Sequence, residues 1–342
     1  MRKLATLVAV CLAVPTVAQS QNQASDHSAI INAVLEKHIL PGFADLSDKT
    51  AALAGAAGQD CAPTSEPLRA AYNGAFDSWM EVSHLRFGPT EVDNLAFGLA
   101  FWPDTRGATP KSLAEMIRSE DPVVDDAAAF TTVSVAARGF YAMEYLLYGD
   151  DLSSAGAPDY HCQLVRAVAT DIHASSAAIL TDWQSRYSDI LRNQPAEPYR
   201  SEEEVIKELY KALTAGLEFT ADTRLGRPLG TFERPRPNRA EARRSERSLR
   251  NVLLSVQALG RLAALLSEGR HPVQDEVDIM FERATLEAER LDDPTFVGVG
   301  TAQGHIRVES LQTAINRVRE VVTIKLGPVL GVSAGFNSLD GD

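Results

Sequence analysis

The chain has 342 residues, a hydrophobic fraction of 45% and a formal net charge of −13 at pH 7. That hydrophobic fraction is typical of a packed protein and excludes a mainly disordered chain, and the length is sufficient for two domains of ordinary size. A chain this acidic is repelled by nucleic acid and by anionic membranes, so we expect no nucleic-acid partner.

Residues 1–18 have the organisation of a secretory signal. Two basic residues precede an apolar stretch at 4–14, and small residues lead to a cleavage site near Ala18. The apolar stretch is too short to span a bilayer, and we expect no transmembrane segment in the mature chain. Lipid attachment at Cys11 is disfavoured, because a valine precedes it where a small residue is needed. We therefore predict an exported, periplasmic protein.

Removal of this segment leaves Cys61 and Cys162 as the cysteines of the mature chain. Both lie in polar, loop-like stretches, and thiols of an exported protein more often pair than stay free. We therefore predict a disulfide between them, with two unpaired thiols as the alternative. Metal binding by this pair alone is not expected, because neither cysteine has a second Cys or His at CxxC-type spacing.

Apolar residues recur at three- and four-residue steps along most of the chain, and no convincing run of strands is found. This pattern predicts an all-α fold. The first predicted helix, 28–57, contains Pro41-Gly42 and should kink or break after the preceding EKHIL stretch. The second carries a buried apolar stripe from Leu68 to Val82. The other predicted helices are 126–148, 161–190, 202–222, 239–266, 274–290 and 303–325.

A polar stretch with two prolines, residues 192–200, is the best candidate for a domain boundary. It divides the mature chain into 19–195 and 196–342. On each side a helix runs into a similar short motif, LRFGP at 85–89 and RLGRP at 224–228. This echo indicates a duplicated helical unit, and chance recurrence of helix-stop residues is the alternative.

The stretch from Arg224 to Arg250 holds nine arginines against three glutamates. In an acidic exported protein, ion pairs with the rest of the chain or a solvated face would explain this excess. An anion-binding or partner-binding edge is the alternative. Within the stretch, Asn238 and Glu241 form a capping-box pattern that predicts the start of the 239–266 helix.

Glu144 is the single charged residue in the apolar, aromatic run 139–149. Helix geometry places it beside Tyr141 and Tyr148 on one face. A buried carboxylate must be paired, hydrogen-bonded, metal-bound or protonated with a raised pKa. Two interpretations stay open: a structural glutamate held by a tyrosine hydroxyl or a neighbouring arginine, or a ligand or proton acceptor in a cleft.

Motifs of the common hydrolytic and cofactor-binding enzymes are missing from the sequence, including HExxH, GxSxG, a Gly-rich phosphate loop and CxxCH. One ExxH pair, Glu81 and His84, has the i,i+3 spacing that places two metal ligands on one side of a helix. The second such pair that a di-iron site requires is not found. A metal at Glu81 and His84 is therefore a weak hypothesis, and a partly exposed helix end is the alternative.

Several stretches together resemble the imelysin-like family, also grouped as peptidase family M75. They are FDSWMEVSHLRFGP (76–89), FWPDTRG (101–107), RGFYAMEYLLYG (138–149), DTRLGRPLG (222–230), AEARRSERSLRNV (240–252) and LGVSAGFNSLDGD (330–342). The blocks span nearly all of the mature chain, and their order makes the resemblance specific. The resemblance implies an all-helical fold of two related halves, each a four-helix-bundle-like unit, in an exported bacterial protein linked to iron acquisition.

The GxHxxE motif of that family falls on Gly139, Tyr141 and Glu144. Tyr141 stands in the place of the motif histidine, which counts against zinc because neutral tyrosine is a poor zinc ligand, whereas a phenolate binds ferric iron. These three residues, together with Arg86 and Trp102 from neighbouring blocks, are the candidate ligand-binding residues. Glu144 and Tyr141 are also candidate metal ligands.

We therefore expect a non-catalytic component of iron or haem acquisition that binds an iron or haem-type ligand in a cleft between the two halves. Its expected partners are iron-uptake components of the cell envelope. The first alternative is an M75-type metallopeptidase that uses Glu144, which is disfavoured because no water-activating ligand set is evident. The second is a scaffold without a small ligand, binding its partner through the arginine-rich stretch.

Overall fold

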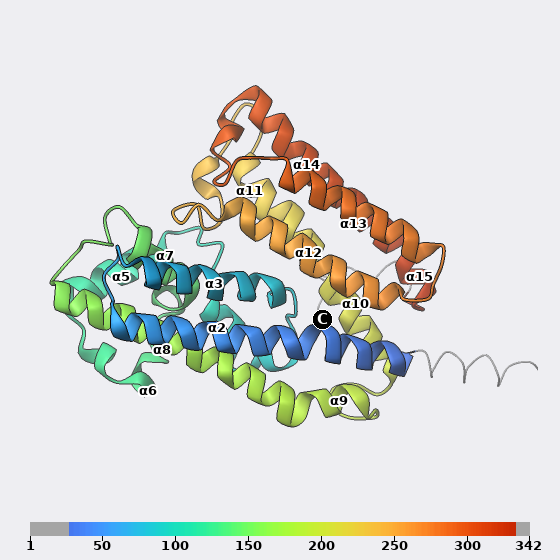
Figure 1. Cartoon of the computed structure of the whole chain (residues 1–342), viewed down its shortest axis with the longest axis horizontal. Coiled ribbons are helices and arrows are strands. Elements are labelled where there is room, and N and C mark those ends of the chain that lie inside the picture. Colours follow the sequence, from blue (N-terminus) through green and yellow to red (C-terminus); the bar gives the residue numbers. More distant parts are fainter. Residues whose placement is uncertain (1–26, 333–342) are drawn as a thin grey trace, which may run out of the picture.

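The computed structural model describes residues 27–332, and these residues form helices and loops without a β-strand. The predicted signal segment and Cys11 lie outside the described residues, as does most of the last sequence block. Two groups of long helices pack against each other (Figure 1). The N-terminal helix group consists of α2 (Leu40–Gln59), α3 (Glu66–Val82), α7 (Gly139–Tyr148) and α8 (Pro158–Asp182). The C-terminal helix group consists of α10 (Glu202–Glu218), α12 (Ser248–Ser267), α13 (Val273–Glu289) and α14 (Ala302–Val321).

In the N-terminal helix group, α2 packs against α3 and α8, and α7 packs against α3 and α8. The predicted stripe of α3 is confirmed, because its apolar residues from Leu68 to Val82 are buried. Phe76 of this stripe stacks on Phe140 of α7 with ring centroids 4.9 Å apart. Such aromatic pairs add stability beyond the area they bury, so this contact holds α7 in the core.

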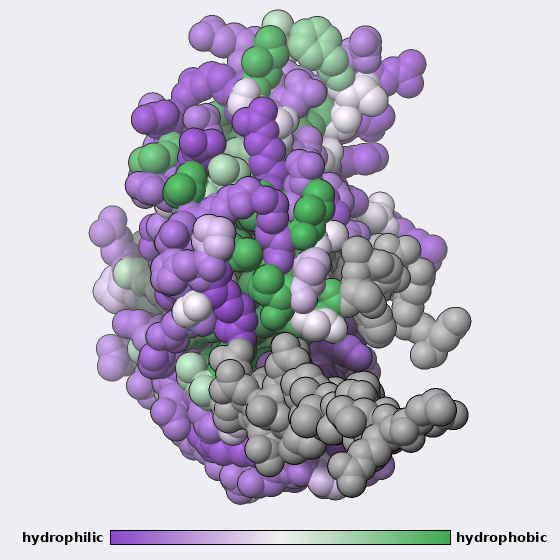
Figure 2. Space-filling view, turned by 90° about the vertical axis from the view of Figure 1, so that its right-hand side faces the viewer, coloured by the Kyte–Doolittle hydropathy of each residue, from purple (hydrophilic) through white to green (hydrophobic). Residues whose placement is uncertain are grey.

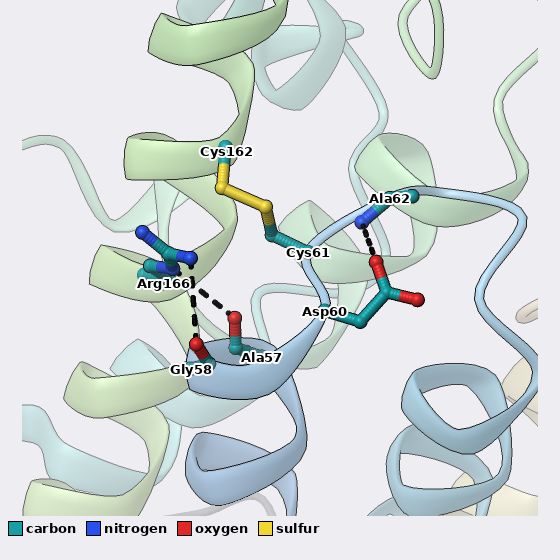
Figure 3. The surroundings of a disulfide bond; sticks show 7 residues. All are labelled: Ala57, Gly58, Asp60, Cys61, Ala62, Cys162 and Arg166. Atoms are coloured by element: carbon teal, nitrogen blue, oxygen red, sulfur yellow. Dashed lines mark hydrogen bonds between the residues drawn. A yellow bond between two sulfur atoms is a disulfide. The ribbon is translucent and has the colours of Figure 1, made fainter.

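The predicted disulfide between Cys61 and Cys162 is confirmed, and it joins the loop after α2 to the first turns of α8 (Figure 3). The two cysteines are 101 residues apart in the sequence. A cross-link of this kind stabilises the folded state by about 2–4 kcal/mol. Arg166 of α8 strengthens the same junction by donating hydrogen bonds to the carbonyl groups of Ala57 and Gly58.

In the C-terminal helix group, α12 is central and packs against α10 and α13, and α14 packs against α10 and α13. Helix α12 also lies along α3, which joins the two groups (Figure 1). Within the described residues it is the one helix with the length and apolarity of a membrane span, and 56% of its most apolar 18-residue stretch is buried in the protein. Most of the face shown in Figure 2 is hydrophilic, with apolar side chains in small groups.

Further helices and π-helical segments connect or extend the two helix groups. The further α-helices are α4 (Leu95–Leu99), α5 (Ala108–Ser119), α6 (Ala127–Phe130), α9 (Ser188–Arg192), α11 (Gly226–Leu229) and α15 (Gly327–Val329). The π-helical segments within residues 27–332 are η1 (Leu35–Ile39), η6 (Trp183–Tyr187), η7 (Phe219–Leu225) and η10 (Val322–Leu326). Such segments often occur at functional sites, and η7 contributes to the cavity described below.

The predicted interruption near Pro41 does not break the first helix. Residues 27–34 are helical, η1 follows, and α2 continues the helix directly from Leu40. Pro41 lies in the first turn of α2, where the missing N–H of proline is tolerated. The disturbance therefore takes the form of a π-helical segment that ends at Ile39.

The predicted continuous helix 126–148 is wrong. This stretch contains the single turn α6, a turn at Thr131, a short 3₁₀ helix and then α7, which begins only at Gly139. The reason is the backbone of Gly139, whose φ of +74° lies in the left-handed region and is incompatible with a helix running through it. Apolar periodicity alone did not reveal this break.

The predicted helix 239–266 is also wrong at its beginning, because α12 begins at Ser248. The preceding residues form turns in which Ala242 and Glu246 adopt positive φ values of 46° and 58°. Glu241 does not cap a helix, since its carboxylate is buried in an ion pair with Arg224. We call residues 240–247 the clamp loop.

The other predicted helices are confirmed with shifts at their ends, and 161–190 corresponds to the consecutive segments α8, η6 and α9. Residues 192–200 lie between α9 and α10 and contain no helix beyond Arg192. The division into 19–195 and 196–342, and the duplication of one helical unit, stay predictions.

Candidate functional site

A cavity of about 460 Å³ lies between the two helix groups. One side of it is formed by α3, α4 and α7, and the other by α10, η7 and α12. Its aromatic lining consists of Trp79, Phe97, Trp102, Tyr141 and Phe219. A concave, largely apolar space of this size with a few convergent polar groups is typical of a small-molecule site.

Gly139, the first residue of the GxHxxE-like motif, has a structural role. A Cβ atom at this position would lie 2.2 Å from the carbonyl oxygen of Leu99, and its φ is +74°. Both the backbone conformation and the close approach therefore require glycine. The contact holds the start of α7 against the segment that leads from α4 to Trp102.

Tyr141 lies in the wall of the cavity and takes part in a buried polar network. Its Oη donates a hydrogen bond to Oε1 of Glu241 at 2.5 Å, and Oε2 of Glu241 accepts one from Nε of Arg224 at 2.8 Å. Burial, and next the negative charge of Glu241, hold the pKa of Tyr141 well above its usual value. A protonated phenol that donates to a carboxylate is not poised to coordinate ferric iron.

Glu144 is buried on α7 and is not among the residues that line the cavity. Its Oε1 accepts hydrogen bonds from the backbone N–H and the Oγ of Ser245 at 3.0 and 2.9 Å, and its Oε2 lies 3.6 Å from Nη1 of Arg244. Burial raises the pKa of Glu144, while the Ser245 hydrogen bonds and Arg244 oppose that shift. Glu144 therefore fastens the clamp loop to α7 through Ser245, a partner that neither interpretation named, with Arg244 nearby.

Trp102 and Arg86 both lie at the cavity. The Trp102 ring stacks near Tyr141 with centroids 6.3 Å apart and meets Phe219 edge-on at 5.9 Å. Arg86 is half-exposed and pairs with Glu91 at 2.6 Å. The structure thus brings Trp102, Tyr141 and Arg86 together, and it gives Gly139 and Glu144 supporting positions beside the cavity.

Glu81 and His84 have different partners. Glu81 pairs with Arg261 at 2.9 Å, whereas Nε2 of His84 lies 2.9 Å from Nε2 of His38. Burial lowers the pKa of His38 to about 4 and holds that of His84 well below its usual value. One of the two nitrogens must donate and the other accept, so the two rings cannot both be charged, and the lowered pKa values favour the neutral form of each. In the described part of the chain, no three His, Cys, Asp or Glu side chains converge to hold a metal ion.

The arginine-rich stretch divides into paired and unpaired residues. Four of its nine arginines form ion pairs: Arg224 with Glu241, Arg244 with Glu144, and both Arg247 and Arg250 with Asp77. Because Glu144 and Asp77 belong to α7 and α3, three of these arginines connect the two helix groups. The remaining five have no ion pair with any residue of 27–332: Arg227, Arg234, Arg236, Arg239 and Arg243.

Sequence reasoning missed three kinds of site residue. It assigned Glu241 to a helix cap rather than to the cavity, it overlooked the aromatic walls Trp79 and Phe219, and it did not find the partner of His84. The signals that were present are the blocks 222–230 and 240–252, which supply Arg224 and Glu241 to the cavity. Their convergence with α7 is a long-range contact that no local pattern reports.

Comparisons with known proteins agree with these observations. The family profile described as Imelysin, peptidase M75, matches residues 39–322. Iron-regulated protein A of Synechococcus elongatus is 23% identical over 350 residues, an alignment that covers 96% of this chain and 91% of that protein.

Two solved structures are similar over most of their length. A crystal structure of an imelysin-like protein from Psychrobacter arcticum superimposes with a TM-score of 0.78 at 17% identity, covering 96% of this chain and 100% of that one. An iron-regulated protein A precursor from Parabacteroides distasonis does so with a TM-score of 0.73 at 14% identity, covering 87% of this chain and 94% of that one. At these identities the two structures confirm the all-helical fold alone.

Proposed function

We propose the following function for this chain, which belongs to the imelysin family. The protein is an exported, non-catalytic component of iron or haem acquisition, and it binds its ligand in the cavity between the two helix groups. Relatives named iron-regulated protein A, and its precursor, support the connection to iron and the export. The signal-like segment 1–18 supports a periplasmic location, with cleavage near Ala18 and with iron-uptake components of the cell envelope as partners.

The observation that carries this proposal is the aromatic cavity itself, lined from both helix groups. The charged groups of its lining are paired within the protein, since Glu241 binds both Tyr141 and Arg224, and the lining residue Asp222 pairs with Arg319 at 3.0 Å. A site whose charges are neutralised and whose walls are aromatic is suited to binding rather than to proton transfer. Ordered walls of this kind reduce the entropic cost of binding.

Titration of the purified protein with ferric citrate, haem and divalent metal ions tests the proposal, with tryptophan fluorescence and calorimetry as readouts. We expect saturable binding of an iron-containing ligand that Trp102→Ala weakens. Ile306→Ala is a matched control, because Ile306 lies in a separate groove between α13 and α14. The proposal fails if no ligand binds and deletion of the gene causes no growth defect under iron limitation.

The metallopeptidase alternative depends on Glu144 reaching a metal ion and a water molecule. Here that carboxylate accepts hydrogen bonds from Ser245 and lies near Arg244, which leaves it committed to the clamp loop. Cleavage of an unfolded substrate by the purified protein, sensitive to chelators and lost in Glu144→Ala, would support the alternative. We expect no such cleavage.

A further inference from the structure

The unpaired arginines of the arginine-rich stretch are unusual in a chain whose net charge is −13. Acidic side chains are abundant in this protein, yet Arg227, Arg234, Arg236, Arg239 and Arg243 have none as a partner among residues 27–332. Arginine is weakly hydrated and presents a planar fork that matches carboxylate and phosphate oxygens. Arginines left unpaired near a cavity are therefore suited to bind an anion from outside the chain.

One of these arginines, Arg227, lies beside the cavity, and Arg239 lies on the short 3₁₀ helix η8 (Pro237–Arg239), which packs against α11, the helix that holds Arg227. The guanidinium carbon of Arg227 is 5.7 Å from the ring centroid of Trp102, which lines the cavity. The Nε of Arg227 is buried and has no hydrogen-bond partner. Burial, and next the positive charge of Arg239, lower the pKa of Arg227. Two neighbouring cations, one with an unsatisfied buried donor, are stabilised when an anion binds between them.

The arginines that line the cavity, in contrast, are paired with carboxylates. Arg224 pairs with Glu241 at 2.8 Å, and Arg86 pairs with Glu91 at 2.6 Å. A ligand body in the cavity therefore meets aromatic faces and neutralised pairs, whereas positive charge without a partner is found at Arg227 and Arg239. The site has an apolar interior and a cationic rim.

We infer that the cavity binds a flat aromatic ligand that carries a carboxylate, with its rings against Trp102 and Phe219 and its carboxylate on Arg227 and Arg239. This inference rests on the proposed function and names the chemical class of its ligand. A porphyrin with carboxylate side chains and an aromatic carboxylate that chelates iron share this chemistry. The rings supply apolar and stacking contacts, and the guanidinium groups supply charge-assisted hydrogen bonds.

The test titrates the intact protein with three probes, following the quenching of tryptophan fluorescence. They are protoporphyrin IX, its dimethyl ester and 2,3-dihydroxybenzoate. The ester keeps the aromatic body of the porphyrin and removes its negative charges, so it isolates the contribution of the rim. The variants are the double substitution Arg227→Gln/Arg239→Gln, the single substitution Trp102→Ala, and a control double substitution Arg283→Gln/Arg317→Gln in the groove between α13 and α14.

We expect a carboxylate probe to bind the unaltered protein and the Arg283→Gln/Arg317→Gln control equally. The double substitution Arg227→Gln/Arg239→Gln, which we call the rim variant, should bind that probe about tenfold more weakly. If the porphyrin is the ligand, its ester binds the unaltered protein and the rim variant with the same reduced affinity. If only 2,3-dihydroxybenzoate shows binding that depends on the arginines, the ligand is the iron-chelating aromatic carboxylate instead. A charge-keeping Arg227→Lys/Arg239→Lys variant should retain part of the lost affinity.

The inference is overturned if the rim variant binds the carboxylate probes as the unaltered protein does, or if the ester binds as tightly as the free acid. If Trp102→Ala still weakens binding in that case, the cavity remains the binding site and only the ligand class is wrong. If no probe binds, or if Trp102→Ala has no effect on any probe that does, the inference fails; the iron-ligand titration and growth test above decide the proposed function separately. Circular dichroism of each variant checks that it folds.

Discussion

Two sets of arginines in one short stretch of the chain have different surroundings. Arg224, Arg244, Arg247 and Arg250 are neutralised by carboxylates, whereas Arg227 and Arg239 have no such partner within residues 27–332. Three residues of the paired set join the clamp loop and α12 to α3 and α7, whereas Arg227 of the unpaired set lies against Trp102 in the cavity wall. Residue type and local composition are the same in both sets, so the three-dimensional environment decides which arginines stabilise the fold and which are available to a ligand.

The largest expected effect on stability comes from breaking the ion pair of a paired arginine. Arg224→Met leaves the buried carboxylate of Glu241 without its cation, which should lower the free energy of unfolding by about 3–5 kcal/mol. Urea denaturation followed by circular dichroism measures it. The double substitution Arg224→Met/Glu241→Gln removes both charges and should recover much of the loss. A loss below about 1 kcal/mol in the single variant would place Arg224 with the unpaired set.

Measuring stability as a function of pH sharpens the comparison. Arginines keep their charge throughout, so any loss of stability on mild acidification comes from other groups. Burial lowers the pKa of His38 from 6.5 to about 4. As the pH falls, this histidine therefore takes up a proton in the unfolded chain before it does so in the folded protein. The protein should lose about 3 kcal/mol of stability as the pH falls from about 6.5, the pKa in the unfolded chain, toward 4. We expect His38→Gln to reduce this pH dependence in urea denaturation, and His271→Gln, at an exposed position, to leave it unchanged.

Glu144→Ala tests the attachment of the clamp loop from the other side. The substitution leaves the backbone N–H of Ser245 without its acceptor, which should cost about 1–3 kcal/mol of stability. Glu144→Gln keeps an acceptor and should cost less. Since Glu144 does not line the cavity, neither variant should weaken ligand binding as strongly as Trp102→Ala, and an equal loss of affinity would assign Glu144 a direct role.

The same residue adds a pH effect of its own. Burial raises the pKa of Glu144, so between the usual pKa and the raised one the folded state holds a proton that the unfolded state has released. Stability from this group is therefore present at low pH and is lost as pH rises from its usual pKa through the raised one. Glu144→Gln should remove this component, and an unchanged pH profile in thermal denaturation would contradict the assignment.

The smallest expected effect on stability belongs to the unpaired set. Arg227→Gln/Arg239→Gln removes no ion pair and should change the free energy of unfolding by less than about 0.5 kcal/mol per site. Urea denaturation of this variant beside Arg224→Met compares the two sets directly. A large loss in the rim variant would mean that these arginines also stabilise the fold.

Much of the architecture could be derived from residue patterns. The all-helical fold follows from three- and four-residue periodicity, as in the buried stripe from Leu68 to Val82. The Cys61–Cys162 bond follows from the chemistry of an exported chain with two cysteines. Of the predicted site residues, Tyr141, Arg86 and Trp102 line the cavity, and their binding of a ligand stays a prediction. All of these depend on local spacing or on residue identity.

The roles within the site depended on the folded structure. Tyr141 and Glu241 are 100 residues apart in the sequence, and Glu144 and Ser245 are 101 apart. The break at Gly139 arises from its approach to Leu99 of another helix, and the late start of α12 accompanies the burial of Glu241 against Arg224. A local pattern reports which residues share a helix face. It does not report which distant carboxylate neutralises a given arginine, because that pairing is selected by burial and packing between helices.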